Sequence, residues 1–155
     1  MYRKHFALSR HVFDKGLEPD ELFESSATAE LSARLTGDAG ALAAEFTRRY
    51  FAHAAPQDLL DDQAENLGGA VLSHWTFARQ RTPGTPSIRV FNPSYDEHGW
   101  SSTHTAVEIV TDDMPFLVDS VTMALNRHGL TVHRLFHPMM PALRDGSGVL
   151  RSLGE

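Results

Sequence analysis

The sequence has 155 residues, 41% apolar and 22% charged, a composition typical of a globular protein with a packed core and not of a disordered chain. The formal net charge is −6 and no basic run exceeds Arg48-Arg49, so the chain lacks the positive surface that a phosphate backbone requires, and we expect no nucleic-acid partner. Cysteine is absent, which excludes disulfides and thiolate metal sites; no signal peptide or membrane-length apolar segment is present, so we expect a cytoplasmic protein without a membrane partner.

Residues 1–55 are predicted to form a helical N-terminal extension. Its first residues mix apolar and charged side chains without a clear pattern. A helix is expected over 19–35, and a second one, which Asp38 can cap, must end before Pro56 because proline cannot continue a helix. Residues 56–155 are predicted to be the main domain.

A third helix and two strands open the main domain. The helix is expected over 57–80, where Gly68-Gly69 would weaken or kink it by about 1 kcal/mol per glycine relative to alanine. Residues 88–91 and 105–110 are short β-prone segments, the second with period-two alternation. Because a polar loop joins the two strands, we expect them to pair antiparallel.

The second strand leads into a helix expected over 115–128. Pro115 suits its first turn, and Asp112 and Asp113 would place negative charge beside the positive end of the helix dipole. Gly129 is expected to end the helix. One stripe of the helix carries Leu117, Val121, Ala124, Leu125 and His128.

A strand over 130–136 is expected to pair with a return strand that begins at Val149, across a turn at 144–148. The elements of the main domain then read helix, strand, strand, helix, strand, strand. This order is a circular permutation of a ferredoxin-like fold. We therefore predict an α+β domain with a four-stranded antiparallel sheet and two helices on one face, preceded by the N-terminal helices. Leu72, Val121 and Leu125 are predicted core residues.

Several motifs of the chain resemble one family in colinear order. The longest is Asp112-Asp113-Met114-Pro115-Phe116-Leu117-Val118-Asp119-Ser120-Val121. The others are Ser73-His74-Trp75-Thr76-Phe77-Ala78, Arg89-Val90-Phe91-Asn92-Pro93, Gly99-Trp100 and His137-Pro138. Together they resemble the N-terminal ACT-like region of the very large bacterial NAD-specific glutamate dehydrogenases, over roughly residues 50 to 150.

The resemblance implies that the chain is a fragment of a longer enzyme. In that family the hydride-transfer machinery lies far downstream, so the fragment would hold no cofactor, and NAD would belong to the parent. The parent would oxidatively deaminate L-glutamate to 2-oxoglutarate and ammonia. The fragment would serve regulation, assembly or both. Its partners would be downstream domains of the same chain and neighbouring subunits of a homo-oligomer.

The loop before the helix at 115–128 is the candidate ligand or interface loop. It comprises Asp112, Asp113, Met114, Pro115, Phe116 and Asp119. The three aspartates could hold a divalent cation or an ammonium group, but helix starts commonly carry aspartate, and we favour a structural role. Trp100, beside Gly99 in a polar loop, is a candidate for an interface with the remainder of a longer chain.

Other patterns support no site. His128, His133 and His137 lack an HExxH or paired-cysteine spacing, so ordinary histidines are favoured over zinc ligands. Ser120 is not on a G-x-S-x-G elbow, and Gly146-x-Gly148 lacks the third glycine of a dinucleotide loop. Core positions are favoured over a ligand box for Trp75 and Phe77.

Two alternatives to the fragment hypothesis remain open. One is a stand-alone, amino-acid-sensing ACT-type regulator, and the other a small metal or acid/base enzyme that uses the Asp112–Asp119 cluster. Against sensing, Pro115 lacks an N–H for a carboxylate, Phe116 fills space that a ligand needs, and two aspartates repel the carboxylate. We therefore favour assembly over sensing.

Overall fold

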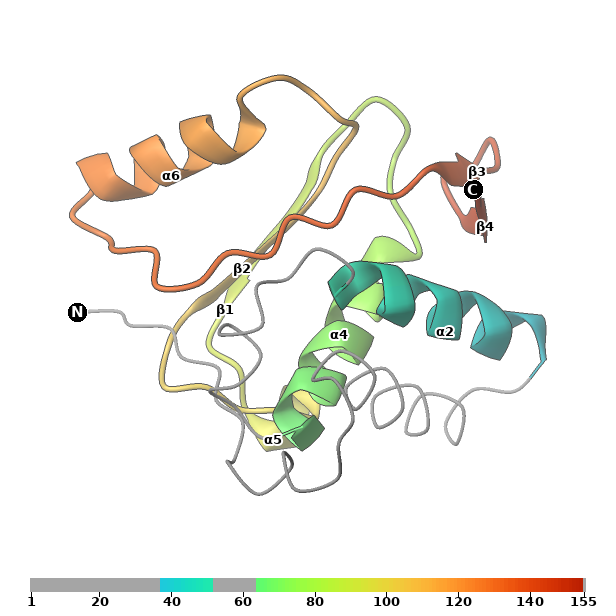
Figure 1. Ribbon diagram of the computed structural model, residues 1–155, viewed down its shortest axis with the longest axis horizontal. Helices are drawn as coiled ribbons and strands as arrows, with labels where there is room; N and C mark the ends of the chain where they lie inside the picture. The colour runs from blue at the N-terminus through green and yellow to red at the C-terminus, as the bar shows by residue number, and fades with distance from the viewer. Residues whose placement is uncertain (1–36, 52–63, 155) are drawn as a thin grey trace, which may run out of the picture.

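The computed structural model describes residues 37–51 and 64–154. The helices are α2 (Asp38–Phe51), α4 (Ala64–Ala78), α5 (Tyr95–His98) and α6 (Leu117–Arg127) (Figure 1). The strands are β1 (Ser87–Phe91), β2 (Ala106–Val110), β3 (Ala142–Arg144) and β4 (Leu150–Leu153). The predicted α+β class is confirmed. The helix expected over 19–35 and the start of the one expected over 57–80 lie outside the described residues.

The strands pair as two separate antiparallel ribbons. Strand β1 pairs with β2, as predicted, with Arg89 opposite Glu108. Strand β4 pairs with β3. The predicted four-stranded sheet is wrong for the described residues, because residues 130–141 form no strand and the partner of the return strand is β3. Pro138 and Pro141 lack the N–H that a ladder needs, so pairing begins only after them.

The two long helices next to the β1–β2 ribbon lie on opposite sides of it (Figure 1). Helix α4 covers the face that carries Arg89 and Ala106. On the other face Ile88 and Val90 remain 60% and 64% exposed. The prediction of two helices on one face is therefore wrong. Both faces of the ribbon carry apolar residues, so period-two alternation did not indicate which face each helix covers.

The main core lies between α2, α4 and β4. It consists of Ala43, Phe46, Phe51, Leu67, Val71, Trp75, Ala78 and Leu150. No residue of α6 is buried, so the prediction of Val121 and Leu125 as buried core residues is wrong. Leu72 is half-buried at the edge of this core, and the core position favoured for Trp75 is confirmed. The boundary at residue 55 stays a prediction, although α2 shares this core.

Gly69 allows α4 to approach the loop before β2. A Cβ at this position would lie 2.5 Å from the Gly99 carbonyl oxygen and 2.7 Å from Trp100 Cβ. Helix α4 runs through both glycines of its Gly68-Gly69 pair without a break. Gly69 thus serves close packing, because any larger residue would push the loop away.

Candidate functional site

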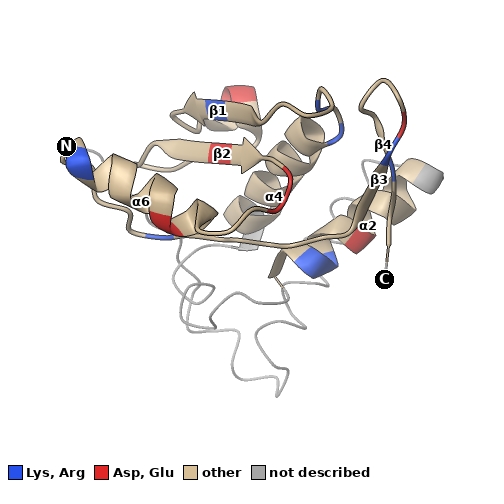
Figure 2. Cartoon of the chain, turned by 90° about the horizontal axis from the view of Figure 1, so that it is seen from above, with Lys and Arg blue, Asp and Glu red and all other residues tan. Residues whose placement is uncertain are grey.

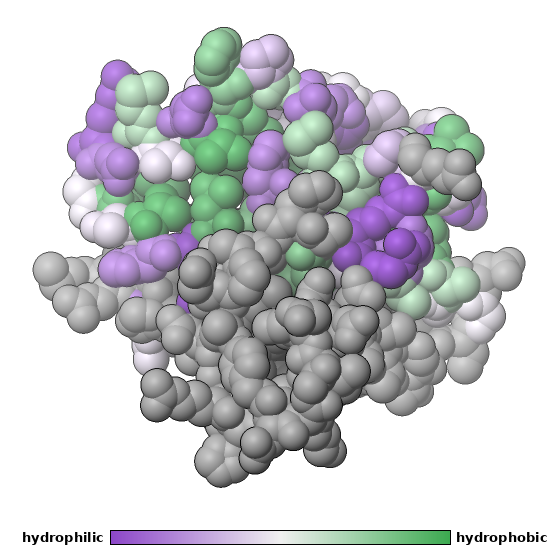
Figure 3. All heavy atoms as spheres, viewed as in Figure 1, coloured by the Kyte–Doolittle hydropathy of each residue, from purple (hydrophilic) through white to green (hydrophobic). Residues whose placement is uncertain are grey.

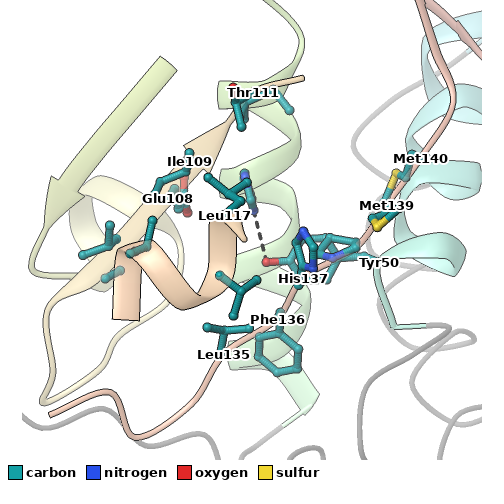
Figure 4. Close-up of a pocket in the computed structure, with 18 of the residues that line it drawn as sticks. Tyr50, Glu108, Ile109, Thr111, Leu117, Leu135, Phe136, His137, Met139 and Met140 are labelled. Carbon is teal, nitrogen blue, oxygen red and sulfur yellow. Dashed lines mark hydrogen bonds between the residues drawn. The ribbon is translucent and has the colours of Figure 1, made fainter. Parts of the chain in front are cut away.

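A large cleft opens between the β1–β2 ribbon, α6, residues 130–141 and the helices α2 and α4 (Figure 4). Its volume is about 1470 Å³. The half-buried stripe of α6, with Leu117, Val121 and Leu125, forms part of its wall. Clefts of this kind, apolar with a few polar groups, are the usual places to look for a ligand site.

Tyr50 and His74 form a polar pair in the wall of the cleft. The Tyr50 hydroxyl lies 3.1 Å from Nδ1 of His74, the contact drawn as a dashed line in Figure 4. Burial and the positive charge of Arg89 lower the pKa of His74 from 6.5 to about 4. Burial and the negative charge of Glu108 raise the pKa of Tyr50. Both groups are therefore neutral near pH 7, which suits a hydrogen-bonded joint between α2 and α4 better than proton transfer.

Arg89 of β1 and Glu108 of β2 form an ion pair across the ribbon, and Arg89 also reaches α4. Arg89 Nε lies 3.1 Å from a Glu108 carboxylate oxygen, and Nη2 donates to the Ser73 carbonyl at 3.1 Å and to its hydroxyl at 3.0 Å. The guanidinium carbon also lies 4.8 Å and 4.4 Å from the ring centroids of Phe77 and Phe91. A charge held by so many partners stabilises the packing and is a poor candidate for chemistry.

The loop of candidate residues after β2 is exposed. Figure 2 shows the acidic stretch directly after that strand. Pro115 does not begin the helix: α6 starts at Leu117, and Phe116, at the N-cap position, has a φ of +63° and an exposed side chain. Asp112 pairs with Arg81 and makes no capping hydrogen bond to α6; its predicted charge interaction with the helix start stays a prediction. The left-handed turn at Phe116 displaces the helix start, so the carboxylate lies too early in the chain to cap it.

Arg81 and Arg144 connect this loop to the β3–β4 hairpin and to the end of α4. Arg81 donates its backbone N–H to the Gly148 carbonyl at 3.1 Å. The Arg144 guanidinium donates to the carbonyls of Ala78 at 2.8 Å and Gly148 at 3.0 Å. Neither arginine was predicted from the sequence as a site residue. Arg81 follows the C-terminal end of α4, a place where a basic side chain could have drawn attention, but Arg144 ends β3 and shares no local spacing with α4, so no signal in the sequence pointed to it.

The remaining candidate residues, Trp100 and Asp119, form no binding site with one another. Trp100 is only 4% exposed and packs with Ala70 and Ala106 in a second small core, so its indole has almost no surface to offer a partner. Asp119 is exposed in the first turn of α6. Among the described residues no group of three histidine, cysteine, aspartate or glutamate side chains is placed to hold a metal ion. His133 lies beside His104, with ring centroids 5.6 Å apart.

Exposed apolar side chains are the other prominent feature. Figure 3 shows them over the part of the surface where α6 and the β1–β2 ribbon lie. They include Ile88, Val90, Met114, Phe116, Met123, Leu135 and Met139. Exposed apolar surface that is contiguous commonly marks a site of interaction. In the described part of the chain, no helix has the length and hydropathy needed to cross a membrane.

Comparison with known proteins gives consistent matches. The family model of the glutamate dehydrogenase ACT1 domain matches residues 46–155. The NAD-specific glutamate dehydrogenase of Halomonas elongata is 44% identical over 115 residues, which are 74% of this chain and 7% of that protein. That of Pseudomonas aeruginosa is 39% identical over 108 residues, 70% of this chain and 7% of that protein. The chain thus spans a small part of the length of these relatives. No solved structure matches it.

Proposed function

The chain belongs to the glutamate dehydrogenase ACT1 domain family, and from this membership we propose that it is a non-catalytic N-terminal assembly domain of a large NAD-dependent glutamate dehydrogenase. The observation that carries the proposal is the extent of the match, which covers most of this chain but 7% of each relative. The parent would deaminate L-glutamate oxidatively to 2-oxoglutarate and ammonia and reduce NAD. Regions outside this chain would bind NAD and carry out the hydride transfer.

The polar groups of the cleft support a non-catalytic role. Three ionisable side chains of its wall already have partners: Tyr50 pairs with His74, and Glu108 pairs with Arg89 of β1. Neither pair forms the nucleophile, base and orienting group of a catalytic set.

The exposed apolar surface supports assembly. Helix α6 has no buried residue, and the face of β1 that is turned away from α4 carries the exposed side chains of Ile88 and Val90. The tip of the loop after β2 adds Met114 and Phe116. Exposure of apolar surface to water costs free energy, so covering it with another protein surface stabilises the complex. Downstream domains of the same chain and neighbouring subunits of a homo-oligomer are the partners that we propose.

Amino-acid sensing is the weaker candidate. Pro115 offers no N–H to a ligand carboxylate, and the exposed Asp113 would repel one. The left-handed backbone of Phe116 places a residue with a large side chain where a glycine would leave the backbone open to a ligand.

Two measurements on the 155-residue chain test the first part of the proposal. We expect no glutamate-dependent reduction of NAD and no saturable binding of NAD in calorimetry. Turnover or NAD binding would contradict a non-catalytic domain. Calorimetric titration with the common amino acids, glutamate and aspartate included, is expected to show no binding that depends on Asp113; saturable millimolar binding that is lost in Asp113→Asn would favour sensing.

Assembly is tested on the complete reading frame. A frame that continues beyond Glu155 is expected, and a stop codon there would contradict the fragment hypothesis. In the complete protein, Val90→Lys should lower the sedimentation coefficient, because it places a charge on the exposed apolar face of β1. Thr85→Lys, an equal charge change in the exposed turn before β1, is the matched control and should leave assembly intact. Equal behaviour of the two variants would contradict docking through this face.

A further inference from the structure

On one edge of the Arg81 guanidinium, only one of the two nitrogens has a hydrogen-bond acceptor among the described residues. The Arg81 side chain is 8% exposed, and Nη2 pairs with the Asp112 carboxylate. Nε is buried and has no hydrogen-bond acceptor among the described residues. Nε and Nη2 lie on one edge of the guanidinium, the edge that an oxyanion can bridge with two parallel hydrogen bonds. A buried donor without an acceptor is costly, so this edge favours a second oxygen.

A second guanidinium is anchored beside Arg81, because Arg144 Nη1 and the Arg81 backbone N–H both donate to the Gly148 carbonyl, at 3.0 Å and 3.1 Å. Burial and the positive charge of Arg81 lower the pKa of Arg144, while the negative charge of Asp112 acts in the opposite direction. Asp145, the next residue, already accepts hydrogen bonds from Ser147 and Arg151. The carboxylate that pairs with Arg81 is that of Asp112, whose side chain is 69% exposed. The three groups Arg81, Asp112 and Arg144 all line the cleft.

We propose that the Nε–Nη2 edge of Arg81 is a binding site for a small oxyanion, a carboxylate or a phosphate group, which displaces the Asp112 carboxylate at this end of the cleft. The Asp112 side chain is 69% exposed and can turn into water when the incoming group takes its place on the buried Arg81 guanidinium. The incoming group gains both hydrogen bonds of the edge and the nearby charge of Arg144. The site is a property of this chain and does not depend on its role in a longer protein.

The surroundings favour an organic anion. Val110, Met140 and Leu153 line the cleft together with Arg81 and are half-buried, so an apolar part of the ligand would find cover there. Inorganic phosphate would use the guanidinium edge alone.

The test is calorimetric titration of the 155-residue chain with sodium phosphate and, separately, sodium succinate, at an ionic strength held constant with sodium chloride. Saturable binding of at least one probe is expected. Tighter binding of succinate would identify a carboxylate ligand, and tighter binding of phosphate a phosphate-bearing one. The titration runs to about 50 mM, which sets the weakest Kd that would count as binding. If neither probe binds saturably up to that concentration, the proposal is overturned.

Two variants with the same charge change make the test specific. Asp112→Asn removes the carboxylate that competes for Arg81 and should tighten binding by at least about two- to fivefold, the factor for a weak ion pair. Asp113→Asn, on the neighbouring exposed residue, should leave the affinity nearly unchanged. Equal tightening in both variants would mean that only the overall charge matters, which would overturn the site. Arg81→Lys keeps the charge but loses the fork and should weaken binding; if this variant fails to fold, the comparison of the two asparagine variants still decides.

Discussion

Replacing Gly148 with alanine should detach the β3–β4 hairpin from the end of α4. Gly148 has a φ of +88°, a region that residues with a side chain rarely adopt. A Cβ there would lie 1.9 Å from the Arg81 carbonyl oxygen and 2.8 Å from its carbonyl carbon. Both are backbone atoms, so no rotamer change can relieve the overlap, and the hairpin itself must move.

The expected loss follows from the contacts at this junction. A left-handed backbone costs alanine about 1–2 kcal/mol. Movement of the hairpin weakens the bond from the Arg81 N–H to the Gly148 carbonyl, at 3.1 Å, and that from the Leu150 N–H to the Arg79 carbonyl, at 2.8 Å. Each such bond contributes about 0.5–1.5 kcal/mol, so we expect a total loss of roughly 2–5 kcal/mol. That is a large fraction of the free energy of unfolding of a typical domain, which is about 5–15 kcal/mol.

Gly146→Ala in the same turn is the matched control. A Cβ at Gly146 would meet no heavy atom within 4 Å. This variant should be neutral or stabilised by up to about 1 kcal/mol, because alanine restricts the unfolded chain. The assay is urea denaturation followed by tryptophan fluorescence, since Trp75 and Trp100 are both buried. If Gly148→Ala loses no more stability than Gly146→Ala, the proposed hairpin junction is refuted.

Three further outcomes are expected in the same assay. The pKa of His74 is about 4 in the folded protein and 6.5 in the unfolded chain, so the unfolded chain takes up the proton first as the pH falls. The free energy of unfolding should therefore be at its full value above pH 6.5 and drop by about 1–3 kcal/mol as the pH falls toward 4, with a smaller drop in His74→Gln. Phe116→Gly should stabilise the protein by up to about 1 kcal/mol, because glycine accepts the positive φ, whereas Phe116→Ala should not; equal stability of the two variants would contradict strain at this residue. Leu125→Ala should cost less than about 1.5 kcal/mol, since α6 has no buried residue; a loss of about 2–5 kcal/mol would place this side chain in a core.

Local patterns in the sequence predicted the elements that depend on near neighbours along the chain. The alternation of residues 105–110 predicted β2 and its pairing with β1, and the apolar stripe from Leu117 predicted α6. Such periodicities are properties of a single element and survive without knowledge of the rest of the fold. The colinear motifs likewise pointed to the family that the comparison confirmed.

Only the tertiary structure decided what lies against what. Asp112 reads as a helix-start residue along the chain, but it pairs with Arg81, which is 31 residues away. Gly69 looks like a weak point of α4, but it is the position where a loop approaches closer than any Cβ allows. The side of the ribbon that α6 occupies also had no local signal, because both faces of β1 and β2 carry apolar residues. In each case the partner is distant in sequence, and the packing free energy of the whole fold, not the local pattern, selects it.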